Sequence, residues 1–172
     1  WNLKDQAAVL ASLFDDAGGS AWSEYLAWAE KLYAVPSFDL EERDYKLEVA
    51  AKMGEARRLC ESRDDSWLPA LRRAFGPPNN MTSWRANDDL LSWCSANPEQ
   101  ARSFLTRLWA NPDDIGPALA DWPVESSAGN KVALTSLLLL AADPARFPVF
   151  RATVLGRTFE LLDLNARIRA TN

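Results

Sequence analysis

The spacing of the apolar residues is the feature that most constrains how this chain folds. Along most of the sequence, apolar side chains recur every three or four residues, as in Ala101, Phe104, Leu105, Leu108 and Trp109. This spacing places them on one face of an α-helix, whereas a half-buried strand needs strict alternation. Only Val149-Phe150 is compatible with a short strand. The sequence therefore predicts an all-α fold, a compact multi-helix domain of seven to nine helices.

Capping and helix-breaking residues give the expected ends of these helices. Ser20 is placed to cap a helix that Pro36 ends, and a long charged segment follows from Ser37 to Ser62. Further helices are expected at Trp67–Phe75, after Asn87-Asp88-Asp89, from Pro98, between 113 and 122, from about Lys131 to Ala142 and from about Ala152 to Leu164. The segments 76–83 and 126–130 are expected to be loops, because Gly, Pro, Ser and Asn dominate them.

The loop GPPNNMTS at residues 76–83 is the best candidate for a domain boundary. It divides the chain into an acidic helical subdomain at 1–76 and a second helical subdomain at 84–172, and one continuous domain is the alternative. Residues 1–66 carry 14 acidic and 8 basic residues, whereas residues 67–172 carry 10 acidic and 11 basic residues. We therefore expect the C-terminal part to meet any polyanion, although neither part has the basic excess of a strong non-specific DNA binder.

The composition indicates a globular protein with a substantial core and no contact with a membrane. Hydrophobic residues make up 48% of the chain, too many for a disordered sequence. The longest apolar run, Val132–Ala142, is interrupted by Thr135 and Ser136 and is shorter than the roughly 20 residues of a membrane-spanning helix. Cys60 and Cys94 lie among apolar neighbours, which favours two buried free thiols in a reducing compartment, the cytoplasm; a single disulfide is the alternative.

The absence of histidine excludes the commonest catalytic and metal-binding arrangements. No Ser-His-Asp or Cys-His arrangement can form without it, and zinc is not expected because there is also no CxxC pair. The segment Ser127–Lys131 departs from the phosphate-binding loop GxxxxGK[ST], since Asn130 separates Gly129 from the lysine. Four Asp-Asp pairs remain, at 15–16, 64–65, 88–89 and 113–114. Such pairs cap helices and form turns more often than they bind metal, so no catalytic residue and no cofactor are expected.

Two groups of residues are candidates for contact with nucleic acid. Trp84 and Arg85 follow the 76–83 loop, and an exposed aromatic ring beside an arginine can stack on an unpaired base. A second group lies around one corner of the chain and is a natural set for binding a phosphate backbone: Lys131, Arg146, Arg151 and Arg157. The alternative is purely structural, with the tryptophan covering the end of a helical core and the basic residues forming solvated faces.

The segment DPARFPVF, from Asp143 to Phe150, predicts a sharp corner between two helices. Asp143-Pro144 is suited to cap and begin a single turn, and Phe147-Pro148 is suited to stop it. The aromatic rings of Phe147 and Phe150 are then expected to fill the gap between the leucine-rich helix before the corner and the last helix.

The pattern L-L-x-x-x-D-P-x-x-F-P-x-[YF]-R at this corner, followed by a helix containing Glu-Leu-Leu, resembles the region N-terminal to the motor of McrB-like AAA+ proteins of bacterial restriction and defence systems. The segment 97–122, with its helix ending in Leu-Trp, is similar to the same family. The residues that carry the resemblance are Pro98, Leu105, Leu108, Trp109, Asp143, Pro144, Phe147, Pro148, Phe150, Arg151, Glu160 and Leu161. The resemblance covers about residues 88–164, and residues 1–87 carry none.

The resemblance implies a non-catalytic N-terminal recognition domain whose motor would lie after Asn172. In such systems this region commonly recognises the target, often modified duplex DNA, and the motor drives a partner nuclease. Modified DNA and a partner nuclease or other protein subunit are therefore the expected partners. A second interpretation is a helical protein-binding or scaffolding domain that binds no nucleic acid. A third, an enzyme acting alone, is disfavoured by the missing catalytic motifs.

Overall fold

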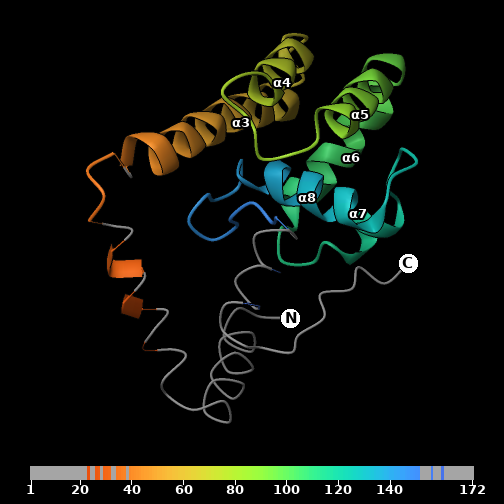
Figure 1. Cartoon of the computed structure of the whole chain (residues 1–172). Helices are drawn as coiled ribbons and strands as arrows, with labels where there is room; N and C mark the ends of the chain where they lie inside the picture. The colour runs from red at the N-terminus through yellow and green to blue at the C-terminus, as the bar shows by residue number, and fades with distance from the viewer. Residues whose placement is uncertain are drawn as a thin grey trace. The chain divides into compact units, whose positions relative to one another are not determined.

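The computed structural model describes residues 23, 26–27, 29–31, 34–37, 39–151, 156 and 160, and these residues form helices and loops without a strand. The predicted all-α fold is confirmed (Figure 1). Six α-helices and one π-helix span the described residues: η1 (Asp39–Asp44), α3 (Tyr45–Glu61), α4 (Trp67–Phe75), α5 (Trp84–Ala96), α6 (Pro98–Ala110), α7 (Gly116–Ala120) and α8 (Ala128–Leu139). Within this part of the chain, none of the helices combines the length and apolar character that crossing a bilayer requires.

Local hydrogen bonds and a proline mark the starts of three helices. The carboxylate of Asp64 accepts a hydrogen bond from the Ser66 amide at 2.8 Å just before α4, as expected for an aspartate that precedes a helix. Pro98 occupies the first turn of α6, where its missing N–H costs nothing. Ser127 caps α8 by accepting a hydrogen bond from the Asn130 amide, so this helix begins at Ala128 and the predicted loop 126–130 is too long.

The predicted start of α5, after Asn87-Asp88-Asp89, is too late. The helix begins at Trp84, so Asn87, Asp88 and Asp89 lie within its first two turns and do not cap it. Asn87 is buried, and its side-chain oxygen accepts a hydrogen bond from the Thr82 hydroxyl at 2.8 Å. That bond fastens the end of the 76–83 loop to the helix, which is how the chain begins the helix without an acidic cap.

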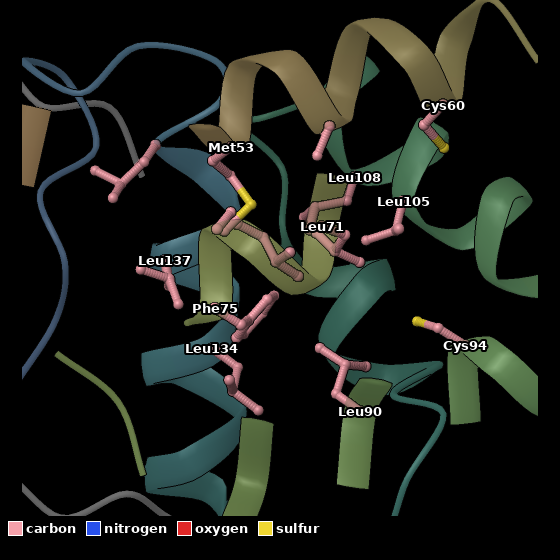
Figure 2. Close-up of a cluster of buried hydrophobic side chains, with 14 of the residues drawn as sticks. Met53, Cys60, Leu71, Phe75, Leu90, Cys94, Leu105, Leu108, Leu134 and Leu137 are labelled. Atoms are coloured by element: carbon pink, nitrogen blue, oxygen red, sulfur yellow. The ribbon is translucent and has the colours of Figure 1, made fainter. Parts of the chain in front are cut away.

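Residues 44–151 form one compact unit around a single apolar core. Helices α3 and α4 form a hairpin, and α5, α6 and α8 add their own apolar faces to the core (Figure 2). The most deeply buried aliphatic side chains come from all five helices and include Met53, Leu71, Leu90, Leu105, Leu134 and Leu137. Each such side chain contributes about 1.5–3 kcal/mol on burial, so the interlocking of these helices is the main source of stability.

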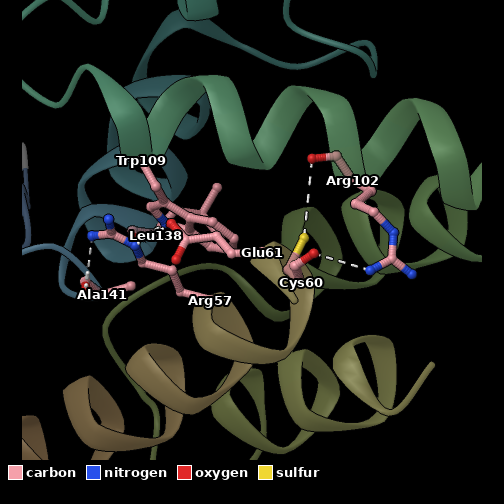
Figure 3. Close-up of polar contacts among 7 residues, drawn as sticks. All are labelled: Arg57, Cys60, Glu61, Arg102, Trp109, Leu138 and Ala141. Atoms are coloured by element: carbon pink, nitrogen blue, oxygen red, sulfur yellow. Dashed lines mark hydrogen bonds and ion pairs between the residues drawn. The ribbon is translucent and has the colours of Figure 1, made fainter. Parts of the chain in front are cut away.

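The 76–83 loop does not separate two subdomains, because contacts on both sides of it join one core. Arg102 of α6 donates to the Cys60 carbonyl of α3 at 3.0 Å, and its guanidinium lies 5.4 Å from the centre of the Trp67 ring of α4 (Figure 3). The last carbonyls of α3 lack partners within the helix, so a cation is favourable at this end. The predicted boundary therefore falls inside the unit, between α4 and α5.

Trp109 ties the end of α6 to the end of α8. Its side chain is 1% exposed, and its indole N–H donates to the Leu138 carbonyl at 2.9 Å (Figure 3). This carbonyl belongs to the last turn of α8 and also accepts a hydrogen bond from the Ala141 amide at 3.2 Å. Arg57 of α3 also reaches this end of α8, at the Ala141 carbonyl.

The predicted turn at Asp143 is present. Asp143 accepts hydrogen bonds at its side chain from the amides of Ala145 and Arg146, and its carbonyl accepts from the Phe147 amide. Phe147 and Val149 pack against the core, whereas the predicted filling of the gap beside the last helix by Phe147 and Phe150 involves residues outside the described ones. The backbone at 149–150 forms no strand.

The backbone after the corner is held against α8. The Phe150 amide donates to the Ser136 hydroxyl of this helix at 2.8 Å. The predicted last helix, 152–164, lies almost entirely outside the described residues, and so do the aspartates at 15–16. The chain turns at 34–37, as the expected stop at Pro36 requires.

Both cysteines are free and buried, as predicted. Cys60 and Cys94 belong to the core between α3, α5 and α6 (Figure 2). Burial raises the pKa of the Cys94 thiol to about 12, and burial also raises the pKa of Cys60. Both side chains therefore act as small apolar groups and stay protonated at neutral pH.

We expect Trp109→Phe to lower the free energy of unfolding by about 1–3 kcal/mol, because it removes the bond to Leu138 and leaves a void in the core. Urea denaturation followed by circular dichroism measures this change. Trp84→Phe, at an exposed position, is the matched control and should change stability by less than about 0.5 kcal/mol. Equal effects of the two substitutions would contradict the role given to Trp109.

We also expect stability to fall as the pH rises above about 8.5, the ordinary pKa of a thiol. Below that pH the thiols are protonated in both states and have no effect. Above it the Cys94 thiol ionises in the unfolded chain but stays protonated in the folded one, so this thiol favours unfolding by up to about 1.4 kcal/mol per pH unit. The raised pKa of Cys60 acts in the same direction. Denaturation between pH 8 and 10 should show a shallower decline for Cys94→Ala, and an unchanged slope would show that this thiol is not protected by burial.

Candidate functional site

Trp84 is the most exposed large apolar side chain of the unit. As the first residue of α5 it is 68% exposed, whereas most tryptophans of the described region pack into the core or against it. The Arg85 guanidinium lies 4.6 Å from the centre of the Trp84 ring, a cation–π distance. The sequence-predicted pairing of these two residues is therefore present, on the surface and open to a ligand.

A surface hollow of about 390 Å³ adjoins this tryptophan. The last turn of α4 forms one wall and the first two turns of α5 form the other. Trp84, Asp88 and Leu91 share one face of α5, since they are spaced four and three residues apart. The full lining is Arg72, Phe75, Gly76, Trp84, Asn87, Asp88 and Leu91. The hollow thus combines an aromatic ring and apolar side chains with a cation, a carboxylate and an amide.

The charged groups of the hollow are not neutralised by one another. Arg72 donates through one nitrogen to two uncharged groups, the Leu91 carbonyl and the Ser95 hydroxyl, and forms no ion pair with the other described residues. Arg85, beside the hollow, lies over the Trp84 ring and has no ion pair within the described part of the chain. Asp88 is exposed and has no hydrogen-bond or ion-pair partner within the described part of the chain. These groups are free to meet a ligand.

Arg73, on the same helix, differs from Arg72 in having a carboxylate partner. It is the neighbour of Arg72 on α4, yet it points to the other side and pairs with Glu55 at 3.4 Å. The difference follows from helix geometry, since adjacent residues face about 100° apart. The two arginines therefore form a matched pair for experiment.

The members of the second predicted group that the structure describes lie on separate segments around the corner. Arg146 forms an ion pair with Asp113 and lies over the Phe147 ring, so its charge is already matched. Lys131 is in the first turn of α8, roughly 12 Å along the axis from the end of that helix. Arg151 is exposed, and Arg157 lies outside the described residues.

Sequence reasoning missed Arg72 and Asp88. Arg72 was not among the candidate residues, and Asp88 was interpreted as part of a helix cap. The four-residue spacing of Trp84 and Asp88 was visible in the sequence, but it places the two residues on one helix face only if α5 begins at Trp84. The approach of Arg72 depends on the packing of α4 against α5, which no local pattern specifies.

Two other aspartates of the predicted pairs have structural roles. Asp64 accepts a hydrogen bond from the Ser66 amide in the turn before α4, and Asp113 pairs with Arg146. Over residues 39–151, no three carboxylate or thiol side chains gather closely enough to hold a metal ion. The segment that faintly resembles a phosphate-binding loop is the capped start of α8.

No protein-family model, curated protein or solved structure matches this chain.

Proposed function

We propose that this chain is a non-catalytic recognition domain, of the kind found N-terminal to the motor in McrB-like defence ATPases, and that it contacts DNA at the hollow beside Trp84. The observation that carries the DNA contact is an exposed indole flanked by two arginines that have no carboxylate partner. Bases stack on aromatic rings, and guanidinium groups bind phosphate oxygens. The resemblance at residues 88–164 supports the link to the defence systems.

The nearly balanced charge of residues 44–151 limits the electrostatic contribution to DNA binding. Residues 44–151 carry 14 acidic and 13 basic residues, so the surface as a whole does not attract a polyanion. Many of the arginines and lysines are paired with carboxylates, as Arg57 is with Glu61 and Arg107 with Asp121. Binding therefore depends on stacking at one place with at most two phosphate contacts, from Arg72 and Arg85.

Docking of a protein partner at the same surface is the second candidate. Tryptophan and arginine are the residues most enriched among those that dominate protein–protein binding energy. The apolar side chains of Phe75 and Leu91 beside Trp84 suit such a contact. The loop that follows α4 also presents Pro77 and Pro78 at the surface nearby.

We expect fluorescently labelled oligonucleotides to bind, and Trp84→Ala to weaken their binding about tenfold, because base stacking on one aromatic ring is worth about 1–3 kcal/mol. Trp84→Phe should retain most of the affinity. Fluorescence anisotropy with plain, methylated and glucosylated duplexes and with single strands measures these affinities.

The salt dependence gives an independent check. With two phosphate contacts, the logarithm of the association constant should fall against the logarithm of salt concentration with a slope of only about −1.4 to −1.8. Arg72→Gln should reduce that slope, and Arg73→Gln should leave it unchanged. If no oligonucleotide binds at low salt, or if Trp84→Ala has no effect, the DNA proposal fails and docking of a protein partner becomes the better account.

A further inference from the structure

We infer that the DNA that this hollow accepts is an unpaired strand, whatever its bases, and not the interior of an intact duplex. This inference rests on the proposed DNA contact and adds the form of DNA that the site takes. It depends on the position of Arg85 against the Trp84 ring, on the size of the hollow and on the charge around it.

Trp84 has one ring face open to a base. The Arg85 guanidinium lies over the other face, 4.6 Å from the ring centre. Arg85 is not among the residues that line the hollow, so it leaves free the space that the hollow provides beside the ring. A side chain that wedges between two base pairs has to contact a base on each of its faces. Trp84 therefore suits stacking against a single base and does not suit insertion into a duplex.

An intact duplex has no base face to offer to such a ring. Within a duplex each base is stacked on its neighbours on both sides, and only the base edges are open in the grooves. In a single strand the bases are free to leave the stack, and stacking on an aromatic side chain is worth about 1–3 kcal/mol for each base of any kind. The main contact of the proposed binding is thus made with an unpaired base.

The size of the hollow also fits one nucleotide. It encloses about 390 Å³ between α4 and α5, near the lower end of the range for small-molecule sites. A duplex is a convex cylinder and contacts only the rim of such a recess. A flexible single strand can place one base against Trp84 and a neighbouring phosphate near Arg72, which has no carboxylate partner among the described residues.

The charge around the hollow favours a single strand as well. A duplex carries one negative charge per about 1.7 Å of its axis, about twice the linear density of one strand. Asp88 lines the hollow and Asp89 follows it in the chain, and both are exposed. These two carboxylates offset the attraction of Arg72 and Arg85, and they repel the denser charge of a duplex more strongly than that of a single strand.

Competition between two forms of one sequence tests the preference. A labelled single strand is bound to the full chain, and either the same unlabelled strand or a relaxed, covalently closed circular duplex containing its sequence is added at equal nucleotide concentration. The circle is closed because the end of a linear duplex exposes the face of a terminal base. We expect the single strand to compete at least about fivefold better, which corresponds to about 1 kcal/mol, the lower end of the stacking contribution.

Substitutions separate stacking from charge. Trp84→Ala should bring the two competitors within about twofold of each other, because phosphate contacts alone do not require an unpaired base. Trp84→Phe should keep the preference. Arg73→Gln removes a cation that is paired with Glu55 on the other side of α4, so it is the control and should leave the ratio of the two affinities unchanged.

Two further measurements show how the ring is used. The indole N–H resonance of Trp84, identified by its loss in Trp84→Phe, should move on addition of the single strand. The closed circle should keep its linking number when a topoisomerase relaxes it in the presence of the chain, because insertion between base pairs would unwind it.

The outcomes distinguish this inference from the DNA proposal. If binding requires Trp84 but the closed circle competes as well as the single strand, or if the chain unwinds the circle, the inference is wrong while the DNA proposal stands. If Trp84→Ala changes no affinity, or if no DNA binds at low salt, the DNA proposal itself fails and the inference fails with it.

Discussion

The burial of α4 is the interaction on which the rest of the unit depends. This helix has nine residues, too few to be stable alone in water. It is held because Ala70, Leu71, Ala74 and Phe75 are buried in the core, most of them against α3. The same burial orients the last turn of α4 toward α5 and so creates the wall of the hollow that carries Arg72.

Several basic side chains of this protein form ion pairs with nearby carboxylates. Ion pairs one helical turn apart occur on α3, and longer-range pairs fasten the exposed ends of helices. Such exposed pairs each add little to stability, but they neutralise Lys52, Arg57, Arg73, Arg107 and Arg146. A ligand that depends on stacking and a few specific hydrogen bonds therefore suits this surface better than one that depends on a large electrostatic attraction.

The residues that carry the resemblance to McrB-like proteins have structural roles wherever the structure describes them closely. Leu105, Leu108 and Trp109 are buried, Asp143 caps the turn of the corner, and Pro98 begins α6. They specify how helices meet, which is a property of the scaffold. The candidate binding residue Trp84 lies just outside the segment that carries the resemblance, so the scaffold and the recognition surface are argued from separate residues.

The sequence by itself determined the fold class, the burial of both cysteines and the corner at Asp143, because each follows from local periodicity, apolar surroundings or capping. It also identified Trp84 and Arg85, which are neighbours in the chain. The sequence did not predict the start of α5, because this start is fixed by a hydrogen bond from Thr82 to the buried Asn87 and not by an acidic cap. Only the tertiary structure decided that Arg72 and Asp88 meet beside Trp84 and that Arg146 is already paired. Those relations join segments distant in sequence, and the packing of several helices around a shared core sets them.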